Sequence, residues 1–326
     1  MQAHSGRSTP TLERWQLGLS FIASLPPLFF IGYFWQHPTV QSQPSESNLS
    51  TWQTTLVDMA RISGVAALLF LGVSLFGEGM RAIHPQPEAI KQARVFEAHT
   101  FTNRRGDTLS YRHHKPEGYD SFQRYPLVVS LHGGAGYGTD NIRQLASWEI
   151  EQLTEPENRK KYPSFIVAPQ CPRGASWGGL PHLVSRDTIV FELLNALEAE
   201  FSIDSNRRYV AGHSLGGYGA RSFIGTHPGV FAAALPLSGT GDPALAKNMV
   251  DVAIWAFHGE KDRNVPVDGC RTVIRAIQQA GGHPHYTEFA NVGHYLNPSL
   301  NAMPGILDWL FAQKRMSQQD RSSLKK

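Results

Sequence analysis

The hydrophobic positions of the chain change their pattern near Arg94. From there on, short apolar runs alternate with longer stretches of helical periodicity. The runs that predict strands buried on both faces are 126–131, 165–168, 209–211, 232–237 and 253–257. The helical stretches are 141–153, 187–201, 215–226 and 269–280. This alternation predicts an α/β fold, with a mostly parallel sheet covered by helices on both faces.

Two further β-type runs precede this alternation. Residues 95–101 and 108–113 flank the turn Arg105-Gly106-Asp107. Short β-type runs separated by a glycine-containing turn are typical of an antiparallel hairpin, so we expect one at the start of the α/β domain.

Upstream of the α/β pattern lie two apolar segments without charge. Segment 15–35 has 21 residues and segment 62–77 has 16. As helices they would measure about 31 Å and about 24 Å, so the first is long enough to span a membrane and the second is marginal. We therefore expect an N-terminal membrane hairpin and linker over 1–87, the α/β domain over 94–314, and a polar tail over 315–326.

The basic residues around these segments predict an orientation, because cytoplasmic loops carry an excess of Lys and Arg. Residues 36–55 between the segments contain no Lys or Arg, whereas Arg7 and Arg14 precede the first segment and Arg81 follows the second. Both ends of the hairpin, and with them the α/β domain, are expected in the cytoplasm. Arg61 counts against this topology. A single anchor with an extracytoplasmic domain, or a soluble or processed chain, remains the alternative.

Composition excludes several classes of protein. The chain has 30 Lys+Arg against 27 Asp+Glu, a net charge of +3, which gives no electrostatic support for nucleic-acid binding. Its two cysteines, Cys171 and Cys270, cannot build a disulfide scaffold, and neither lies in a zinc or dithiol spacing. We expect both to be reduced thiols.

A candidate nucleophile lies in Gly212-His213-Ser214-Leu215-Gly216, which follows the predicted strand 209–211 and opens a predicted helix. In such a Gly-x-Ser-x-Gly elbow the serine occupies a sharp strand-to-helix turn, and the glycines let strand and helix approach. A serine hydroxyl needs a neighbouring base, itself oriented by a third group. Ser214 therefore predicts a histidine and an acid elsewhere in the chain.

The expected chain order is serine, acid, histidine. His294, in a loop after the strand-like residues 286–289, is the expected base, and Asp262, which follows the strand ending at Phe257, is the expected acid. The remaining downstream histidines, given structural or solvent-facing roles, are His227, His258, His283 and His285. The other acids are Asp242, Asp251, Glu260 and Asp268; Asp242 and Glu260 are the fallbacks, and Asp268 is expected to cap a helix.

A glycine-rich loop, Leu131-His132-Gly133-Gly134-Ala135-Gly136, follows another predicted strand. Acyl transfer develops negative charge on a carbonyl oxygen, which backbone N–H groups stabilise. We expect the N–H groups of Gly134 and Leu215 to form this oxyanion hole, with Ala135 as the neighbouring donor. His132 is expected to make a structural hydrogen bond.

Several stretches together resemble a known family. They are LHGGAGYGTDN (131–141), APQCPRGASW (168–177), YVAGHSLGGYGA (209–220), LPLSG (235–239), WAFHGEKDRNVPV (255–267) and YTEFANVGHYLNP (286–298). They resemble the α/β-hydrolase esterases that include polyhydroxybutyrate-depolymerase-like, feruloyl-esterase-like and predicted-peptidase proteins. The resemblance implies an α/β-hydrolase fold with Ser214, Asp262 and His294 as the catalytic residues. Trp177, in one of these stretches, is expected either to line the substrate pocket or to pack in the core.

These residues predict two-step hydrolysis of a small-molecule or polymeric carboxylic ester through an acyl-enzyme, with no metal or organic cofactor. A serine peptidase or another acyl hydrolase has the same catalytic groups. A catalytically inactive, membrane-tethered scaffold is the alternative from a different class of protein.

Overall fold

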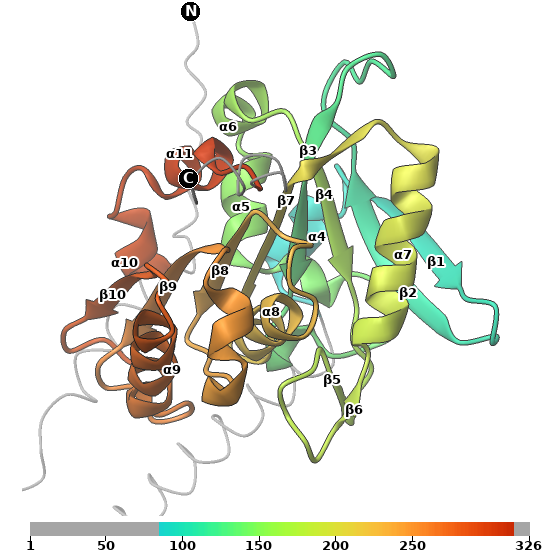
Figure 1. Cartoon of the computed structure of the whole chain (residues 1–326). Helices are drawn as coiled ribbons and strands as arrows, with labels where there is room; N and C mark the ends of the chain where they lie inside the picture. The colour runs from blue at the N-terminus through green and yellow to red at the C-terminus, as the bar shows by residue number, and fades with distance from the viewer. Residues whose placement is uncertain (1–84, 316–326) are drawn as a thin grey trace, which may run out of the picture. The chain divides into compact units, whose positions relative to one another are not determined.

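The computed structural model describes residues 85–315 (Figure 1). Within these residues the main sheet has eight strands in the order β1-β2-β4-β3-β7-β8-β9-β10. β2 pairs antiparallel with both β1 and β4, and every other pair is parallel. The strands are β1 Glu97–Thr102, β2 Thr108–His114, β3 Tyr125–Leu131, β4 Phe165–Pro169, β7 Ile203–His213, β8 Ala233–Leu237, β9 Ala253–Gly259 and β10 His285–Phe289. A separate small ladder joins β5 Ala175–Ser176 to β6 Val184–Ser185.

The central strands are buried on both faces, as their continuous apolar runs predict. All seven residues of β3 are buried. Because successive side chains point to opposite faces, Leu127 and Val129 enter one core and Val128 enters the other. The expected mostly parallel sheet, with an antiparallel hairpin at its start, is confirmed.

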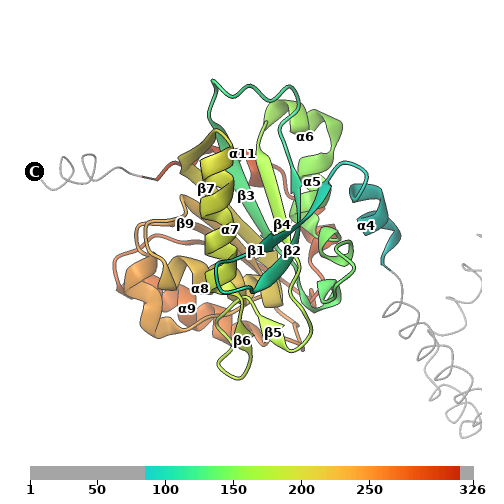
Figure 2. The ribbon, with the colours of Figure 1, turned by 90° about the vertical axis from the view of Figure 1, so that its right-hand side faces the viewer.

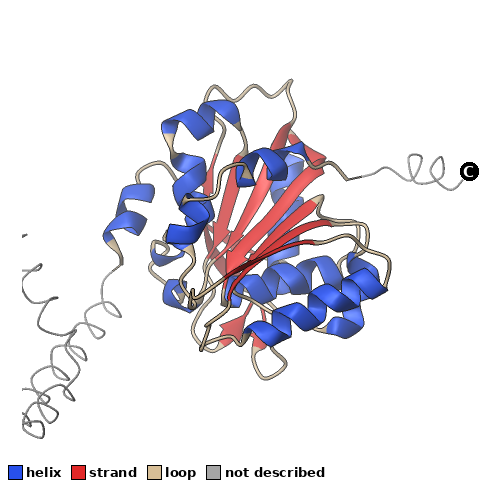
Figure 3. Ribbon diagram, turned by 90° about the vertical axis from the view of Figure 1, so that its left-hand side faces the viewer, coloured by secondary structure: helices blue, strands red, loops and turns tan. Residues whose placement is uncertain are grey.

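Helices cover both faces of the sheet (Figure 3). On one face lie α7 Asp187–Glu200, α8 Leu215–Thr226 and α9 Val267–Gln279, together with the 3-10 segment η3 Pro243–Met249. On the other lie α4 Pro87–Gln92, α5 Trp148–Thr154, α10 Asn297–Asn301 and α11 Ile306–Ala312. The short helix α6 Pro156–Lys161 follows α5 and has no buried residue. The 3-10 turns η1 Gly134–Gly136 and η2 Arg143–Leu145 complete the described elements.

The prediction of one helix over 141–153 is wrong in its first half. The structure places the single turn η2 there, and α5 begins only at Trp148. Asn141 has a left-handed backbone (φ 53°), its N–H donates to Gln170 Oε1 (2.6 Å) and its side chain donates to the carbonyl of Tyr111 (3.1 Å). These contacts tie Asn141 to neighbouring strands, and they override the local helical pattern.

The predicted segments 15–35 and 62–77 lie outside the described residues, as does the tail from 316 onward. Within 85–315, no helix combines the length and the apolar character needed to cross a bilayer. The folded body extends upstream of 94, because Ala89 of α4 is fully buried and Arg112 Nη1 donates to the carbonyls of Ala93 and Phe96.

Glu149 of α5 is a fully buried carboxyl group. Its Oε1 accepts a hydrogen bond from Ser130 Oγ (2.6 Å), and burial raises its pKa.

The raised pKa of Glu149 gives a prediction for stability. A group whose pKa is raised by folding stabilises the protein at low pH, and this contribution is lost as the pH rises through the folded-state pKa. We therefore expect Glu149→Gln to gain stability relative to the wild type as the pH increases from about 4 to about 9. Denaturant unfolding of both proteins across this range measures the difference; a difference that shrinks with pH would contradict the buried-acid assignment.

Candidate active site

Ser214 occupies a strained turn between β7 and α8. Its backbone has φ 57° and ψ −115°, a conformation that non-glycine residues rarely adopt. A Cβ on Gly212 would lie 2.5 Å from the carbonyl oxygen of Leu131, and one on Gly216 would lie 1.7 Å from the same oxygen. The two glycines of the motif are therefore required because β3 and α8 meet there.

This close contact gives a prediction for stability. In Gly216→Ala the new methyl group overlaps the Leu131 carbonyl, a backbone atom that cannot move aside without displacing β3. We expect a loss of at least about 4 kcal/mol in the free energy of unfolding, or insoluble protein. Gly134→Ala is the matched control, because the nearest atom to its Cβ is 4.0 Å away. Equal melting temperatures for the two variants would show that the turn is looser than the structure indicates.

Asp262 and His294 form a hydrogen-bonded pair. His294 Nδ1 lies 2.7 Å from Asp262 Oδ2, and Asp262 Oδ1 accepts the N–H groups of Asn264 and Val265, both at 2.9 Å. Burial on its own would raise the pKa of Asp262, but the Val265 N–H and the His294 imidazole more than offset this effect and hold the pKa below its usual value. Asp262 is therefore an anion at neutral pH, and it orients His294 through the Nδ1 hydrogen.

The loops that carry this pair are joined through their backbones. The N–H of Lys261 donates to the carbonyl of Val292 (2.8 Å), and the N–H of Glu260 donates to that of Phe289 (3.0 Å). Gly259 has room only for a hydrogen, since a Cβ would lie 2.1 Å from the carbonyl oxygen of Gly293. The predicted acid and the predicted base are thus positioned by backbone hydrogen bonds between the ends of β9 and β10.

His294 lies beside the serine elbow. Its carbonyl accepts hydrogen bonds from His213 Nε2 (2.8 Å) and from Ser238 Oγ (3.2 Å). The rings of His213 and His294 are 4.7 Å apart, centroid to centroid. Since His213 directly precedes Ser214, these contacts place the loop of the predicted base next to the segment that carries the predicted nucleophile, and both side chains are half-buried.

The glycine-rich loop flanks the same turn. A Cβ on Gly133 would lie 3.5 Å from Ser214 Cβ. Gly134 and Ala135 are solvent-exposed at the start of η1, while Leu215 is the first residue of α8 and its N–H has no acceptor within the helix. The predicted donors of the oxyanion hole therefore lie on the two segments that border Ser214.

His132 has a structural role, as expected. Its Nε2 accepts the N–H of Cys171 (2.9 Å), so Nδ1 carries the hydrogen and donates to the carbonyl of Gly133 (2.7 Å). Burial lowers the pKa of His132 to about 4, so the ring is neutral at pH 7. This side chain fixes the glycine-rich loop to the end of β4.

Trp177 is fully buried, so it does not form the open pocket wall that the sequence suggested as one option. Its indole Nε1 donates to the carbonyl of His132 (3.0 Å), and its ring packs edge-on against the His132 imidazole at 5.0 Å. It supports the glycine-rich loop from the core, which agrees with the packing alternative.

Other candidate acids have different partners. Asp242 caps η3 by accepting the N–H of Ala244 (2.8 Å), Glu260 accepts the N–H of Asn291 (2.8 Å), and Asp268 pairs with Arg271 (2.7 Å). Asp268 lies in the first turn of α9 but caps no N–H, contrary to expectation. None of these three carboxylates makes a recorded contact with His294 within residues 85–315.

His258 was not predicted to belong to the site. It is fully buried at the end of β9, and its Nε2 lies 2.8 Å from the carbonyl of Val265 and 3.3 Å from Asp262 Oδ2. The carbonyl must accept, so Nε2 carries the hydrogen and also faces the carboxylate. In the sequence, His258 lies four residues before Asp262 at the end of a predicted strand, and this spacing could have indicated that the two side chains are neighbours.

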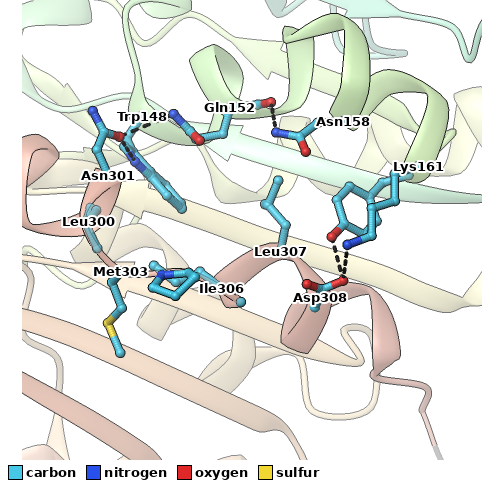
Figure 4. A pocket seen from close by; sticks show the side chains of 13 residues that line it. Trp148, Gln152, Asn158, Lys161, Leu300, Asn301, Met303, Ile306, Leu307 and Asp308 are labelled. Atoms are coloured by element: carbon cyan, nitrogen blue, oxygen red, sulfur yellow. Dashed lines mark hydrogen bonds and ion pairs between the residues drawn. The ribbon is translucent and has the colours of Figure 1, made fainter.

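A polar pocket between α5–α6 and α10–α11 lies apart from these residues (Figure 4). Trp148 Nε1 donates to Asn301 Oδ1 (2.8 Å) on one side, and Lys161 pairs with Asp308 (2.7 Å) on the other. No predicted catalytic residue lines it, and its walls belong to the sheet face opposite α8.

Comparison with known proteins assigns the described domain to a family. The family model described as "Putative esterase" matches residues 102–279, more than half of the chain. The chain belongs to this esterase family. The family match includes the elbow at Ser214 and the predicted acid Asp262 and ends before His294, the predicted base, which the Asp262–His294 hydrogen bond connects to the matched region.

Individual relatives of this esterase-family chain are similar over part of their length. A probable feruloyl esterase C of Aspergillus terreus is 30% identical over 171 residues, which are 51% of this chain and 60% of that protein. The poly(3-hydroxyalkanoate) depolymerase C of Paucimonas lemoignei is 28% identical over 135 residues, 39% of this chain and 30% of that protein. The crystal structure of a thermostable esterase matches with a TM-score of 0.65 and 34% identity, covering 68% of this chain and 64% of that one. The chain thus spans less than two thirds of the length of each of these relatives. The match to the esterase structure and to the family model confirms the predicted α/β-hydrolase fold.

Proposed function

We propose that this protein is a serine hydrolase that cleaves carboxylic esters with Ser214 as nucleophile, His294 as base and Asp262 as the orienting acid. The observation that carries the proposal is the 2.7 Å hydrogen bond between His294 Nδ1 and Asp262 Oδ2, in a loop that contacts His213, the residue before the strained Ser214. Membership of the esterase family supports ester hydrolysis over the other acyl transfers that the same groups perform.

The proposed reaction has two acyl-transfer steps. Because Nδ1 of His294 donates to Asp262, Nε2 is the free acceptor, and it removes the Ser214 proton as the oxygen attacks the acyl carbon. The N–H groups of Gly134 and Leu215 stabilise the resulting oxyanion. His294 then protonates the leaving alcohol, and a water molecule repeats the sequence to release the acid. The ionised Asp262 stabilises the imidazolium that forms in each step.

The names of the relatives suggest which acyl groups to test. The purified full-length chain should hydrolyse p-nitrophenyl esters between acetate and palmitate, and the chain-length profile measures the acyl pocket. Methyl ferulate and poly(3-hydroxybutyrate) test the aromatic and polymeric esters suggested by the two curated relatives. Cleavage of a peptide anilide without turnover of any ester would replace the proposal with a peptidase.

In this proposal the apolar segments 15–35 and 62–77 also anchor the chain to a membrane. We expect the full-length protein to stay in the membrane fraction after a carbonate wash, and a variant that starts at residue 85 to be released from it. Protease protection of the α/β domain in inverted vesicles then distinguishes a cytoplasmic from an extracytoplasmic position. Full-length protein in the soluble fraction would contradict the anchor.

A further inference from the structure

Three side chains on the β1–β2 hairpin converge outside the catalytic region. Glu97 and His99 are two residues apart on β1, so they point to the same face, and His113 of β2 is the direct cross-strand partner of Glu97. One donor atom from each lies within 4.8 Å of the others. The hairpin forms one edge of the sheet (Figure 2).

Three ring nitrogens of this cluster lack hydrogen-bond partners within residues 85–315. Neither ring nitrogen of His113 has one, although the side chain is only 4% exposed, and His99 Nε2 has none either, among the residues that the structure describes. The rings of His99 and His113 stack at 4.7 Å, and Tyr111 and Phe201 pack against them. A buried polar atom without a partner costs free energy, which makes this arrangement unfavourable unless something binds the lone pairs.

The two carboxylate oxygens of Glu97 face different side chains. Oε1 lies 3.2 Å from Lys115 Nζ, whereas Oε2 faces His99 Nε2 at 3.5 Å and His113 Nε2 at 3.7 Å. These two distances are too long for hydrogen bonds. They approach the separation of about 3.3 Å between ligand atoms in tetrahedral zinc, whose bonds measure about 2.0–2.1 Å. An octahedral ion with bonds of about 2.1 Å, such as Mg²⁺, would bring neighbouring ligands closer together, to about 3.0 Å.

We propose that Glu97, His99 and His113 bind a divalent transition-metal ion, for which Zn²⁺ is the best fit. Two imidazoles and one carboxylate are a common zinc donor set, and the exposed side of Glu97 and His99 leaves a fourth position for water. Sequence analysis did not identify this set of residues, because the three side chains meet only through the register of the hairpin.

The ion would act on the sheet edge and not on acyl transfer. β4 and β3 separate β2 from the elbow strand β7, which corresponds to about 14 Å at the usual strand spacing. Because the three ligands come from two strands, a bound ion would cross-link the edge strand β1 to β2. The metal site therefore stands independently of the proposed esterase activity.

Two measurements on the full-length chain, after treatment with a chelator, test the site. Calorimetric titration with ZnCl₂ measures the Kd, and thermal unfolding measures the effect of bound Zn²⁺ on stability. We expect Zn²⁺ at about 100 times its Kd to raise the melting temperature by about 5–10 °C, and Mg²⁺, which prefers oxygen ligands, to leave it unchanged. Glu97→Gln and His99→Phe, which preserve shape and ring stacking, should each weaken binding at least about tenfold. His283→Ala, which removes an exposed histidine elsewhere, is the matched control and should bind as the wild type does.

Co²⁺ gives a second measurement that needs no variant. Bound to the wild-type protein, it should show the intense visible absorption of a tetrahedral site, and Zn²⁺ should displace it. Wild-type affinity in both ligand variants, or a weak octahedral Co²⁺ spectrum, would overturn the proposal, whatever the outcome of the esterase assays.

Discussion

Ser214→Ala is expected to lower kcat for p-nitrophenyl ester hydrolysis by about 10⁴- to 10⁶-fold, because the substitution removes the atom that forms the acyl-enzyme. The residual rate comes from the oxyanion hole and from binding alone. KM should change little, since the hydroxyl makes its decisive contact only during bond formation.

The assay needs a control for folding, because residue 214 has a strained backbone. Ser222→Ala removes a hydroxyl two turns further along α8 and should retain wild-type turnover. Labelling by a fluorophosphonate should disappear in the Ser214 variant and persist in the Ser222 variant. Ester turnover by a folded Ser214→Ala protein within tenfold of the wild-type rate would rule out Ser214 as nucleophile.

Asp262→Asn is expected to lower kcat by about 10⁴-fold while the protein remains folded. An amide in place of Oδ2 no longer requires the hydrogen of His294 on Nδ1, so the ring can place it on Nε2, where it blocks proton removal from Ser214. The loss should be larger than that of any change at an acid outside the site.

Asp268→Asn is the matched control, because Asp268 is surface-exposed and its carboxylate pairs with Arg271 and not with His294. Rates measured across a range of pH separate the two effects: the Asp262 variant should be slow at every pH, and the Asp268 variant should follow the wild type. A larger loss of activity at Asp268 than at Asp262 would contradict the assignment of the acid.

The local sequence was sufficient to predict those parts of the site that lie within one short segment of the chain. The elbow could be predicted because its Gly-x-Ser-x-Gly pattern lies within one strand–turn–helix unit, although the backbone atom that requires Gly212 and Gly216 belongs to Leu131 of β3. The pairing of Asp262 with His294 could be predicted only from chain order, since the backbone contacts between their loops join residues about thirty positions apart.

Other features depend on contacts that no local pattern encodes. The early break in the helix predicted at 141–153 follows from the hydrogen bonds of Asn141 to Tyr111 of β2 and to Gln170, which directly follows β4. Likewise, the position of His258 next to Asp262 requires the turn that returns Val265 to the end of β9. Trp177 lies in the core because the chain after β4 turns beneath the glycine-rich loop, a path that its flanking sequence does not specify.

Because backbone hydrogen bonds join the ends of β9 and β10 directly, the chain between these two strands is not needed to hold Asp262 and His294 together. Asp262 and His294 are held by Gly259 to Lys261 on one side and Phe289 to Gly293 on the other, so the turn at 280–284 between α9 and β10 contributes no contact to the pair. Insertions at this turn should therefore be neutral for catalysis. That turn is a suitable position for accepting an added binding module, or a loop that selects among substrates, during evolution or in engineering.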